Sequence, residues 1–295
     1  MRELTIVINT YDMQREAPRT LRSVLPPLQK AVSSADYEVI VIDNGAKHAL
    51  SLAGVDFAGI DVRLFRVPTD ASHSSPVFAI NDCISHMANG RFVMVCIDGA
   101  RMFSPYVVRR TLDALNRMPN SFTYVGSRHL GSDVQMKSTL SGYGPDQEDT
   151  LLQSVNWTQD LDRLNEISVW AGAHKYNNAF TQNESNAFAL QRSQWQETGG
   201  YNSRFVRSGG GLCNLEIFKR LVERPDARNI LLWGETTFHQ VHGGAATSNA
   251  GYFSKAQEEF KQAVGTDYQL PCYNFEVDKG IAYGREAAIG KWYCK

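Results

Sequence analysis

One stretch of chain, residues 92–99, constrains the fold more than any other. Six consecutive apolar residues, Phe92 to Ile97, lead directly into Asp98 and then Gly99. A short unbroken apolar run that ends in polar residues and glycine is typical of a strand buried on both faces of a parallel sheet. In open α/β sheets, ligands bind just beyond the carboxyl ends of such strands. The sequence therefore predicts a buried strand that delivers Asp98 to a binding site.

The same pattern recurs through the first hundred residues. We expect strands at 4–9, 37–43, 61–67 and 92–97, and helices at 18–32 and 76–87. Pro26 and Pro27 must interrupt or kink the first helix, because proline donates no backbone hydrogen bond. Alternation of strands and helices predicts βαβ units with right-handed crossovers. The expected fold class is α/β with a mostly parallel central sheet, beginning with a Rossmann-like nucleotide-binding half.

Composition narrows the class of protein further. The chain has 295 residues, 43% of them hydrophobic and 21% charged, with a formal net charge of −1. Such a balance gives no field that would draw the protein to nucleic acid. The five cysteines contain no C-x-x-C pair, which argues against a zinc ribbon and a disulfide framework. The first residues show no signal peptide, so we expect a reducing, cytoplasmic location.

Common nucleotide and hydrolase motifs are missing from the sequence. No G-x-G-x-x-G follows the first predicted strand, and there is no P-loop, no G-x-S-x-G and no H-E-x-x-H. What remains is a pair of strands that end in Asp43 and Asp98. Carboxylates there can accept hydrogen bonds from a base or ribose, or hold a divalent metal on a diphosphate.

Three of these strand ends resemble the signatures of family 2 glycosyltransferases, which have the GT-A fold. The matching segments are 6–11, 41–45 and 95–99, followed by 186–190, 199–205 and 209–216. The resemblance covers about residues 4–245. It implies a GT-A domain over 1–245, with a nucleotide-binding half at 1–100 and an acceptor half at 101–245. Residues 246–295 would then form a helical, aromatic-rich C-terminal extension.

The resemblance also implies a set of donor-binding residues. Thr10 and Tyr11 would contact the nucleotide base, and Asp43 would bind it from the second strand. Asn81, in the helix predicted at 76–87, is assigned to the same nucleotide-binding set. Asp98 would be the metal-binding acid. The implied donor is a nucleotide-diphosphate sugar, with a UDP-sugar favoured.

The metal motif departs from the family pattern. The family usually supplies two or three acids, whereas here Asp98 is followed by Gly99 and Ala100. GT-A enzymes often bring a histidine from the far end of the domain to the metal, and His242 matches that position. His239 is a second candidate ligand, or else a residue that orients the loop or contacts a phosphate. Imidazole with carboxylate suits Mn²⁺, with Mg²⁺ as the alternative.

The catalytic base is the second departure. Inverting members carry a Glu-Asp pair where this chain has Cys213 and Asn214, and asparagine cannot accept a proton near neutral pH. Glu184 and Glu216 are the carboxylates that remain nearby in sequence. Glu216 has a structural alternative, as an acid at the start of a helix. The order Asn-Leu-Glu at 214–216 also resembles some retaining GT-A transferases, so the stereochemistry stays open.

Two further segments bear on the acceptor. In the insertion at 142–178, apolar residues recur at helical spacing from Trp157 to Ile167, and Trp170 follows. Such a segment can cover an acceptor site with a tryptophan stacked on a sugar, or it can simply be core. After an amphipathic helix expected at 253–264, the aromatic tail at 270–295 could cover the domain, join a dimer or approach a lipid-linked acceptor.

Together these features predict metal-dependent sugar transfer from a nucleotide-diphosphate sugar to a glycan, lipid-linked or other hydroxyl acceptor, in cell-surface polysaccharide synthesis. Nucleic acid is not an expected partner. Peripheral membrane association and homo-oligomer formation stay open. The alternative is a non-catalytic nucleotide-sugar or glycan-binding domain of the same fold, which the missing base acid favours.

Overall fold

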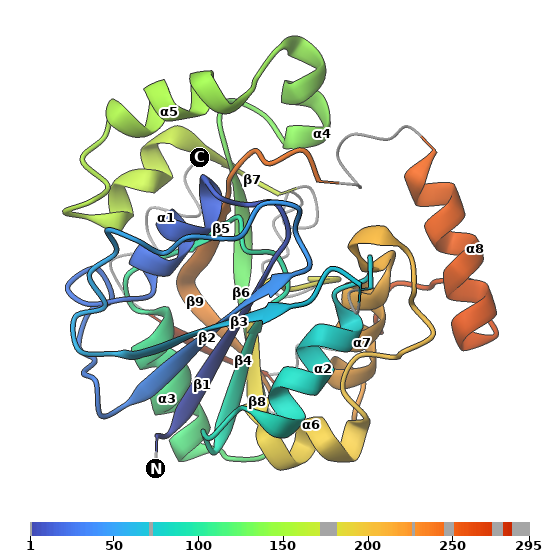
Figure 1. Cartoon of the computed structure of the whole chain (residues 1–295). Helices are drawn as coiled ribbons and strands as arrows, with labels where there is room; N and C mark the ends of the chain where they lie inside the picture. Colours follow the sequence, from blue (N-terminus) through green and yellow to red (C-terminus); the bar gives the residue numbers. More distant parts are fainter. Residues whose placement is uncertain are drawn as a thin grey trace.

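A mixed β-sheet forms the centre of the structure (Figure 1). The structure is a computed structural model that describes residues 2–70, 73–171, 182–225, 228–244, 251–272 and 280–284. Within these ranges the sheet has ten strands, with the main order β10-β9-β6-β8-β4-β1-β2-β3. The strands are β1 (Leu4–Thr10), β2 (Tyr37–Asn44), β3 (Asp61–Val67), β4 (Phe92–Cys96), β5 (Arg101–Phe103), β6 (Ser121–Leu130), β7 (Ser168–Trp170), β8 (Phe188–Gln191), β9 (Arg228–His239) and β10 (Gly280–Gly284).

Parallel pairing gathers the ends of the first strands at one edge of the sheet. β1 lies between β2 and β4 and is parallel to both. In this register Thr10 is the partner of Asp43, and Ile8 is the partner of Cys96. The residues that follow β4, beginning with Ile97 and Asp98, therefore emerge beside the carboxyl end of β1.

Helices cover both faces of the sheet. They are α1 (Glu16–Ser23), α2 (Val77–His86), α3 (Val107–Arg117), α4 (Gln135–Ser138), α5 (Pro145–Gln153), α6 (Arg192–Thr198), α7 (Cys213–Val222) and α8 (Tyr252–Val264), with short 3₁₀ helices η1 (Thr139–Ser141), η2 (Leu161–Ile167) and η4 (Ser208–Gly210). Alternate residues of β4 pack on opposite sides: Val93 and Val95 face α2 and α7, whereas Met94 and Cys96 face α1 and α3. Burial on both faces explains the unbroken apolar run of this strand.

Two helix predictions are wrong in their extent or type. The helix expected over 18–32 is α1, which runs from Glu16 to Ser23 and ends before Pro26. Proline lacks the backbone donor and disfavours helical geometry in the residue before it. The segment with helical spacing from Trp157 to Ile167 contains the 3₁₀ helix η2. A spacing of three suits a 3₁₀ helix, which has three residues per turn.

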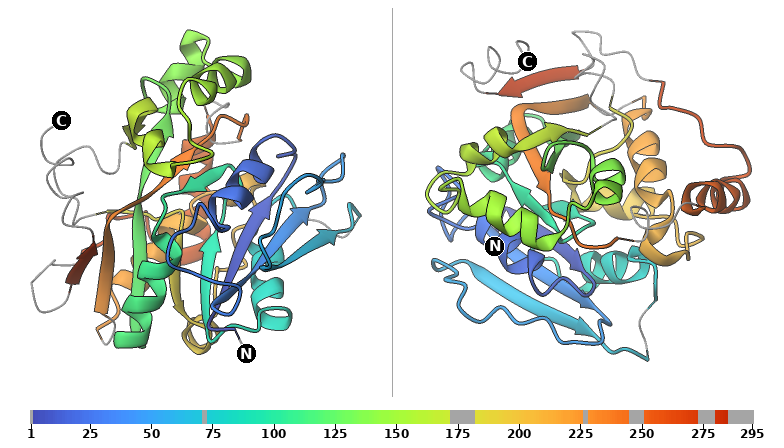
Figure 2. Two further views of the ribbon diagram at one scale, coloured as in Figure 1. Left: turned by 90° about the vertical axis from the view of Figure 1, so that its left-hand side faces the viewer. Right: turned by 90° about the horizontal axis from the view of Figure 1, so that it is seen from above.

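Residues 131–170, here called the cover segment, contain α4, η1, α5, η2 and β7. Figures 1 and 2 show α4 and α5 above the end of the sheet at which β1, β2 and β4 finish. Leu161 and Leu164 anchor the segment in a third apolar cluster with Leu130 and Phe238. The cover segment thus lies at the end of the sheet where a ligand is expected.

The C-terminal extension contacts the main sheet and core. The amphipathic helix expected at 253–264 is α8, whose Phe260 packs on Phe205 with ring centroids 5.9 Å apart. β10 runs parallel to β9 at the sheet edge. The aromatic tail predicted at 270–295 lies largely outside the described residues. Among the helices that are described, none has the length and apolar character needed to cross a bilayer.

Candidate functional site

Three predicted metal ligands meet at one carboxylate oxygen. Asp98 lies in the turn after β4, His239 is the last residue of β9, and His242 follows three residues later. His239 Nε2 is 3.0 Å and His242 Nε2 is 3.6 Å from Asp98 Oδ2, and the two Nε2 atoms are 3.1 Å apart. One ligand atom from each residue lies within 4.8 Å of the others. The structure therefore brings together residues from the two halves of the chain.

The turn after β4 is shaped by packing against β1. Asp98 Oδ1 accepts a hydrogen bond from the backbone N–H of Ala100 at 3.0 Å, which closes the turn. A Cβ on Gly99 would lie 2.5 Å from Thr10 Cγ2 and 2.9 Å from the carbonyl oxygen of Asn9. Real Cβ atoms do not approach so closely, so glycine is required here for the turn to contact the end of β1.

Two of the three residues in this cluster have pKa values that suit metal binding. Burial raises the pKa of Asp98, but the adjacent imidazoles of His242 and His239 outweigh burial and hold this pKa well below its usual range. Burial and the nearby Arg101 hold the pKa of His239 well below its usual value. Burial lowers the pKa of His242, yet the Asp98 charge outweighs it and raises this pKa. The shifts of Asp98 and His239 thus favour an ionised carboxylate and a neutral imidazole, the donor states that a metal ion needs, whereas the shift of His242 favours its protonated form.

Arg15 and Glu148, here called the clamp, hold the loop that carries His242. Glu148 in α5 accepts a hydrogen bond from the backbone N–H of Val241 at 2.8 Å, and Arg15 donates one to the Val241 carbonyl at 2.6 Å. Arg15 also pairs with Glu148 at 3.0 Å and with Asp149 at 2.6 Å. Both backbone groups of Val241 are therefore tied to α5 and to the residue before α1.

Desolvation is the largest influence on Glu148. Its side chain is fully buried, and burial raises its pKa to about 7 despite the hydrogen bond from Val241 and the charge of Arg15. Neither Arg15 nor Glu148 was expected from the sequence. No local pattern could have revealed this pair, because the two residues are 133 positions apart.

The predicted base-binding residues lie at the ends of β1 and β2. Thr10 Oγ1 donates a hydrogen bond to the carbonyl of Ile42 at 2.7 Å. Asp43 Oδ2 accepts one from the Leu50 backbone at 3.0 Å, whereas its buried Oδ1 has no hydrogen-bond partner within the described ranges. An unpaired buried acceptor is costly, and a ligand N–H would satisfy it. Tyr11 is half exposed beside this position.

Asn81 lies in α2, and its side chain is engaged elsewhere. Its Nδ2 donates to the Tyr201 carbonyl at 2.8 Å, and its Oδ1 accepts from the Tyr201 backbone N–H at 3.0 Å. The side chain thus connects α2 to the segment after α6. Among the described residues, the hydrogen bonds of the Asn81 side chain go to Tyr201 and not to Asp43 or Asp98.

The two candidate bases have different surroundings. Glu216 in α7 forms a two-point ion pair with Arg220, at 2.8 and 3.0 Å. In the described part of the chain, the one hydrogen bond of the Glu184 side chain comes from Asn214 Nδ2 at 3.5 Å. Asn214 also donates to the Ser185 carbonyl at 3.0 Å and accepts from the Tyr201 hydroxyl at 3.1 Å. The asparagine that stands in place of the family acid therefore contacts Glu184.

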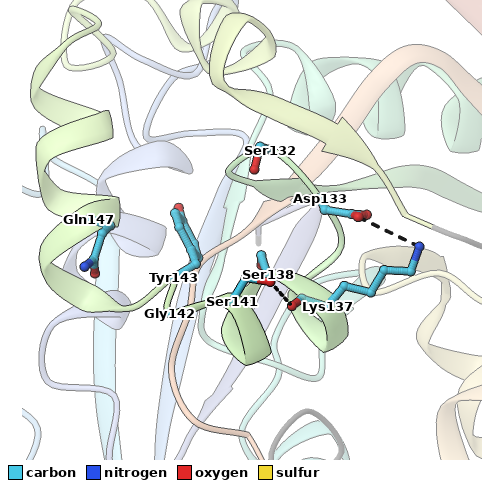
Figure 3. A pocket seen from close by; sticks show the side chains of 8 residues that line it. All are labelled: Ser132, Asp133, Lys137, Ser138, Ser141, Gly142, Tyr143 and Gln147. Atoms are coloured by element: carbon cyan, nitrogen blue, oxygen red, sulfur yellow. Dashed lines mark hydrogen bonds and ion pairs between the residues drawn. The ribbon is translucent and has the colours of Figure 1, made fainter.

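The cover segment contains a polar pocket of about 540 Å³ (Figure 3). It is lined by Ser132, Asp133, Lys137, Ser138, Ser141, Gly142, Tyr143 and Gln147. The Tyr143 hydroxyl lies 3.4 Å from Glu148 Oε2, so the pocket adjoins the residues that hold the His242 loop. Trp170 stacks on the guanidinium of Arg128 at 4.6 Å, and Trp157 is buried in the third apolar cluster.

No protein-family model matches the chain, and no curated protein matches it. Several solved structures, however, match its fold. The chain superposes on residues 1–349 of S. aureus TarS in complex with UDP with a TM-score of 0.53 and 9% identity, over 90% of this chain and 67% of that one. For the TarS complex with UDP-GlcNAc, the TM-score is 0.55 and the identity 10%, over 89% and 67%. The shared fold confirms the prediction of a GT-A fold.

Proposed function

We propose that this chain is a glycosyltransferase that transfers a sugar from a nucleotide-diphosphate donor to a hydroxyl acceptor with the help of a divalent metal. The observation that carries the proposal is the convergence of Asp98, His239 and His242 at the sheet edge where β1 and β2 present Thr10 and Asp43. The GT-A fold supports it, since solved structures of TarS with this fold hold UDP and UDP-GlcNAc.

Each half of the site has a proposed task. Asp43, with its unpaired buried oxygen, and Thr10 and Tyr11 would bind the nucleotide base; Asn81 stays a prediction for this set. Asp98, His242 and His239 would hold the metal, and their one carboxylate and two imidazoles suit Mn²⁺, with Mg²⁺ as the alternative. When bound, such an ion stabilises negative charge on the leaving diphosphate.

Glu184 is the proposed proton acceptor for the attacking hydroxyl. Glu216 is held by Arg220 at two points, which suits a structural carboxylate, whereas among the described residues Glu184 has a single long hydrogen bond, from Asn214. A carboxylate with free lone pairs can accept a proton, and the amide of Asn214 cannot. This assignment corresponds to an inverting reaction.

A second candidate function is a nucleotide-sugar or glycan-binding domain without catalysis. The observation that favours it is the pair Cys213 and Asn214, which stands where an acid pair is expected. Both functions require the donor site, so they differ in turnover and not in donor binding.

The test is UDP release from a panel of UDP-sugars, supplied with Mn²⁺ and with glycan acceptors, together with calorimetric titration of UDP. We expect release, and we expect Asp98→Ala and His242→Ala to abolish the Mn²⁺-dependent part of UDP binding. Both side chains are in a turn or loop, so neither substitution opens a core cavity. Donor binding without release would favour the binding domain. Unchanged UDP affinity in both variants would refute the shared metal site.

The wider setting also belongs to the proposal. A glycan or lipid-linked acceptor could enter over the cover segment, whose polar pocket offers hydroxyl and amide groups of the kind that bind sugar hydroxyls. Action in the cytoplasm on cell-surface polysaccharide, peripheral membrane association and homo-oligomer formation stay predictions from the sequence.

A further inference from the structure

Arg101 forms an ion pair with Asp98, the carboxylate of the cluster that Asp98 forms with His239 and His242. It begins β5, three residues after Asp98, and is paired in antiparallel register with His239. Its Nε lies 3.3 Å from Asp98 Oδ2, the same oxygen that both imidazoles approach. Its side chain is only 10% exposed. A fixed positive charge is therefore built into the site at which a metal is expected.

The hydrogen bonds of the Arg101 guanidinium show which of its N–H donors could still bind a ligand. Its planar geometry places Nε and Nη2 on one edge and Nη1 on the other. Ser127 Oγ accepts a hydrogen bond from Nη1 at 2.7 Å and fixes that edge. Nε lies 3.3 Å from Asp98 Oδ2, whereas Nη2, on the same edge, has no hydrogen-bond partner in the part of the chain that is described.

The charge of the cluster points to an anion as the missing partner. Asp98 brings one negative charge to the cluster, and the guanidinium of Arg101 places one positive charge directly beside it. A site with two or three acids attracts a divalent cation strongly, whereas this one attracts it less and offers a positive guanidinium in a low-dielectric place. The planar, always-charged fork of arginine suits phosphate oxygens particularly well.

We propose that Arg101 is a protein-supplied cation of the diphosphate site, and that its free Nη2 edge binds the diphosphate of the donor even when no divalent metal is present. In a site with a second acid, the bound metal would neutralise the diphosphate. Here Arg101 supplies part of that positive charge itself. This inference rests on the proposed function, since it assumes that the cluster receives a nucleoside diphosphate.

The experiment is calorimetric titration of UDP into the full chain, once in EDTA and once in Mn²⁺. We expect the wild type to bind UDP in EDTA, and Arg101→Gln to weaken that binding roughly tenfold or more, as for loss of a hydrogen bond to a charged group. Titrated with Mn²⁺ alone, Arg101→Gln should bind the ion more tightly than the wild type, because the competing positive charge is gone.

The matched control is Arg63→Gln, which removes a different ion-paired arginine, the half-buried partner of Glu38 on β2. It should leave UDP binding unchanged in both conditions. Arg101→Met retains the buried stem without any donor and gives the same readout if the glutamine variant does not fold.

Three outcomes would overturn the inference. The first is wild-type binding of UDP in Mn²⁺ but not in EDTA, which leaves the proposed function intact. The second is unchanged binding in EDTA when Arg101 is replaced by Gln or Met. The third is no UDP binding in either condition, which refutes the proposed function as well.

Discussion

Replacing Glu184 by glutamine tests the proposed base directly. The amide retains the size of the side chain and can still accept the 3.5 Å hydrogen bond from Asn214, but it cannot accept a proton. Because Glu184 has no ion pair or close hydrogen bond with any described residue, the free energy of unfolding should change by less than about 0.5 kcal/mol. Turnover should fall roughly 10²–10⁴-fold, the range for removal of a general base. That loss corresponds to about 3–5 kcal/mol in the activation free energy.

Glu216→Gln is the matched control, with the same chemical change on α7. It removes the charge that pairs with Arg220 at 2.8 and 3.0 Å, while Arg220 retains its hydrogen bonds to the carbonyls of Thr198 and Gly200. Arg220 is 31% exposed, so we discount the loss for solvent screening to about 1 kcal/mol of unfolding free energy. In a chain of this size that is a decrease of about 2–4 °C in melting temperature. Turnover should hardly change.

The assay is UDP release at saturating donor and acceptor, with UDP titration and thermal unfolding measured on the same preparations. The reasoning holds if Glu184→Gln loses turnover at normal stability and normal UDP affinity, while Glu216→Gln loses stability at normal turnover. Normal turnover in Glu184→Gln with a large loss in Glu216→Gln would make Glu216 the base. Normal turnover in both would contradict an inverting mechanism that uses either carboxylate.

Three further perturbations have defined outcomes. Asp43→Ala removes the unpaired buried acceptor, so UDP titration should show affinity reduced roughly tenfold, and unchanged affinity would exclude Asp43 from base binding. Gly99→Ala places a methyl group 2.5 Å from Thr10 and should lower the free energy of unfolding by about 1–3 kcal/mol in urea; a neutral result would contradict the close approach. Burial raises the pKa of Glu148 from 4.5 to about 7, so the folded state holds its proton between these values and stability falls as pH rises through them. Glu148→Gln should therefore flatten the decline in melting temperature between pH 5 and 7.5, and an unaltered decline would refute this linkage.

The fold was predictable where local pattern and topology coincide. An apolar run such as Phe92 to Ile97 has few options other than a strand buried on both faces, and parallel pairing then requires Thr10 and Asp43 to end at the same edge. Prediction failed where one pattern fits two structures. The spacing from Trp157 to Ile167 suits an α-helix and a 3₁₀ helix alike, and the packing of Leu161 and Leu164 decides between them.

The site was predictable only in part, for a related reason. The family resemblance predicted a metal at the two histidines before the Gly243-Gly244 pair, and in the structure both imidazoles lie beside Asp98. Arg101 was not predicted, because its proposed role depends on the strand partner His239 and on Ser127, which are distant in sequence. Glu148 was missed because its significance comes from tertiary burial, which leaves no signal in the residues around it.

The clamp on Val241 has a consequence for how the protein is made. Its members are distant in sequence: Arg15 is 133 residues from Glu148 and 226 from Val241. Contacts of such separation form late, because a long loop must close before they contribute. During synthesis, Arg15 and Glu148 leave the ribosome well before the loop that carries His242 does. Neither residues 1–100 nor 101–245 can therefore complete the clamp alone, and assembly of this loop should be a late, cooperative step of folding.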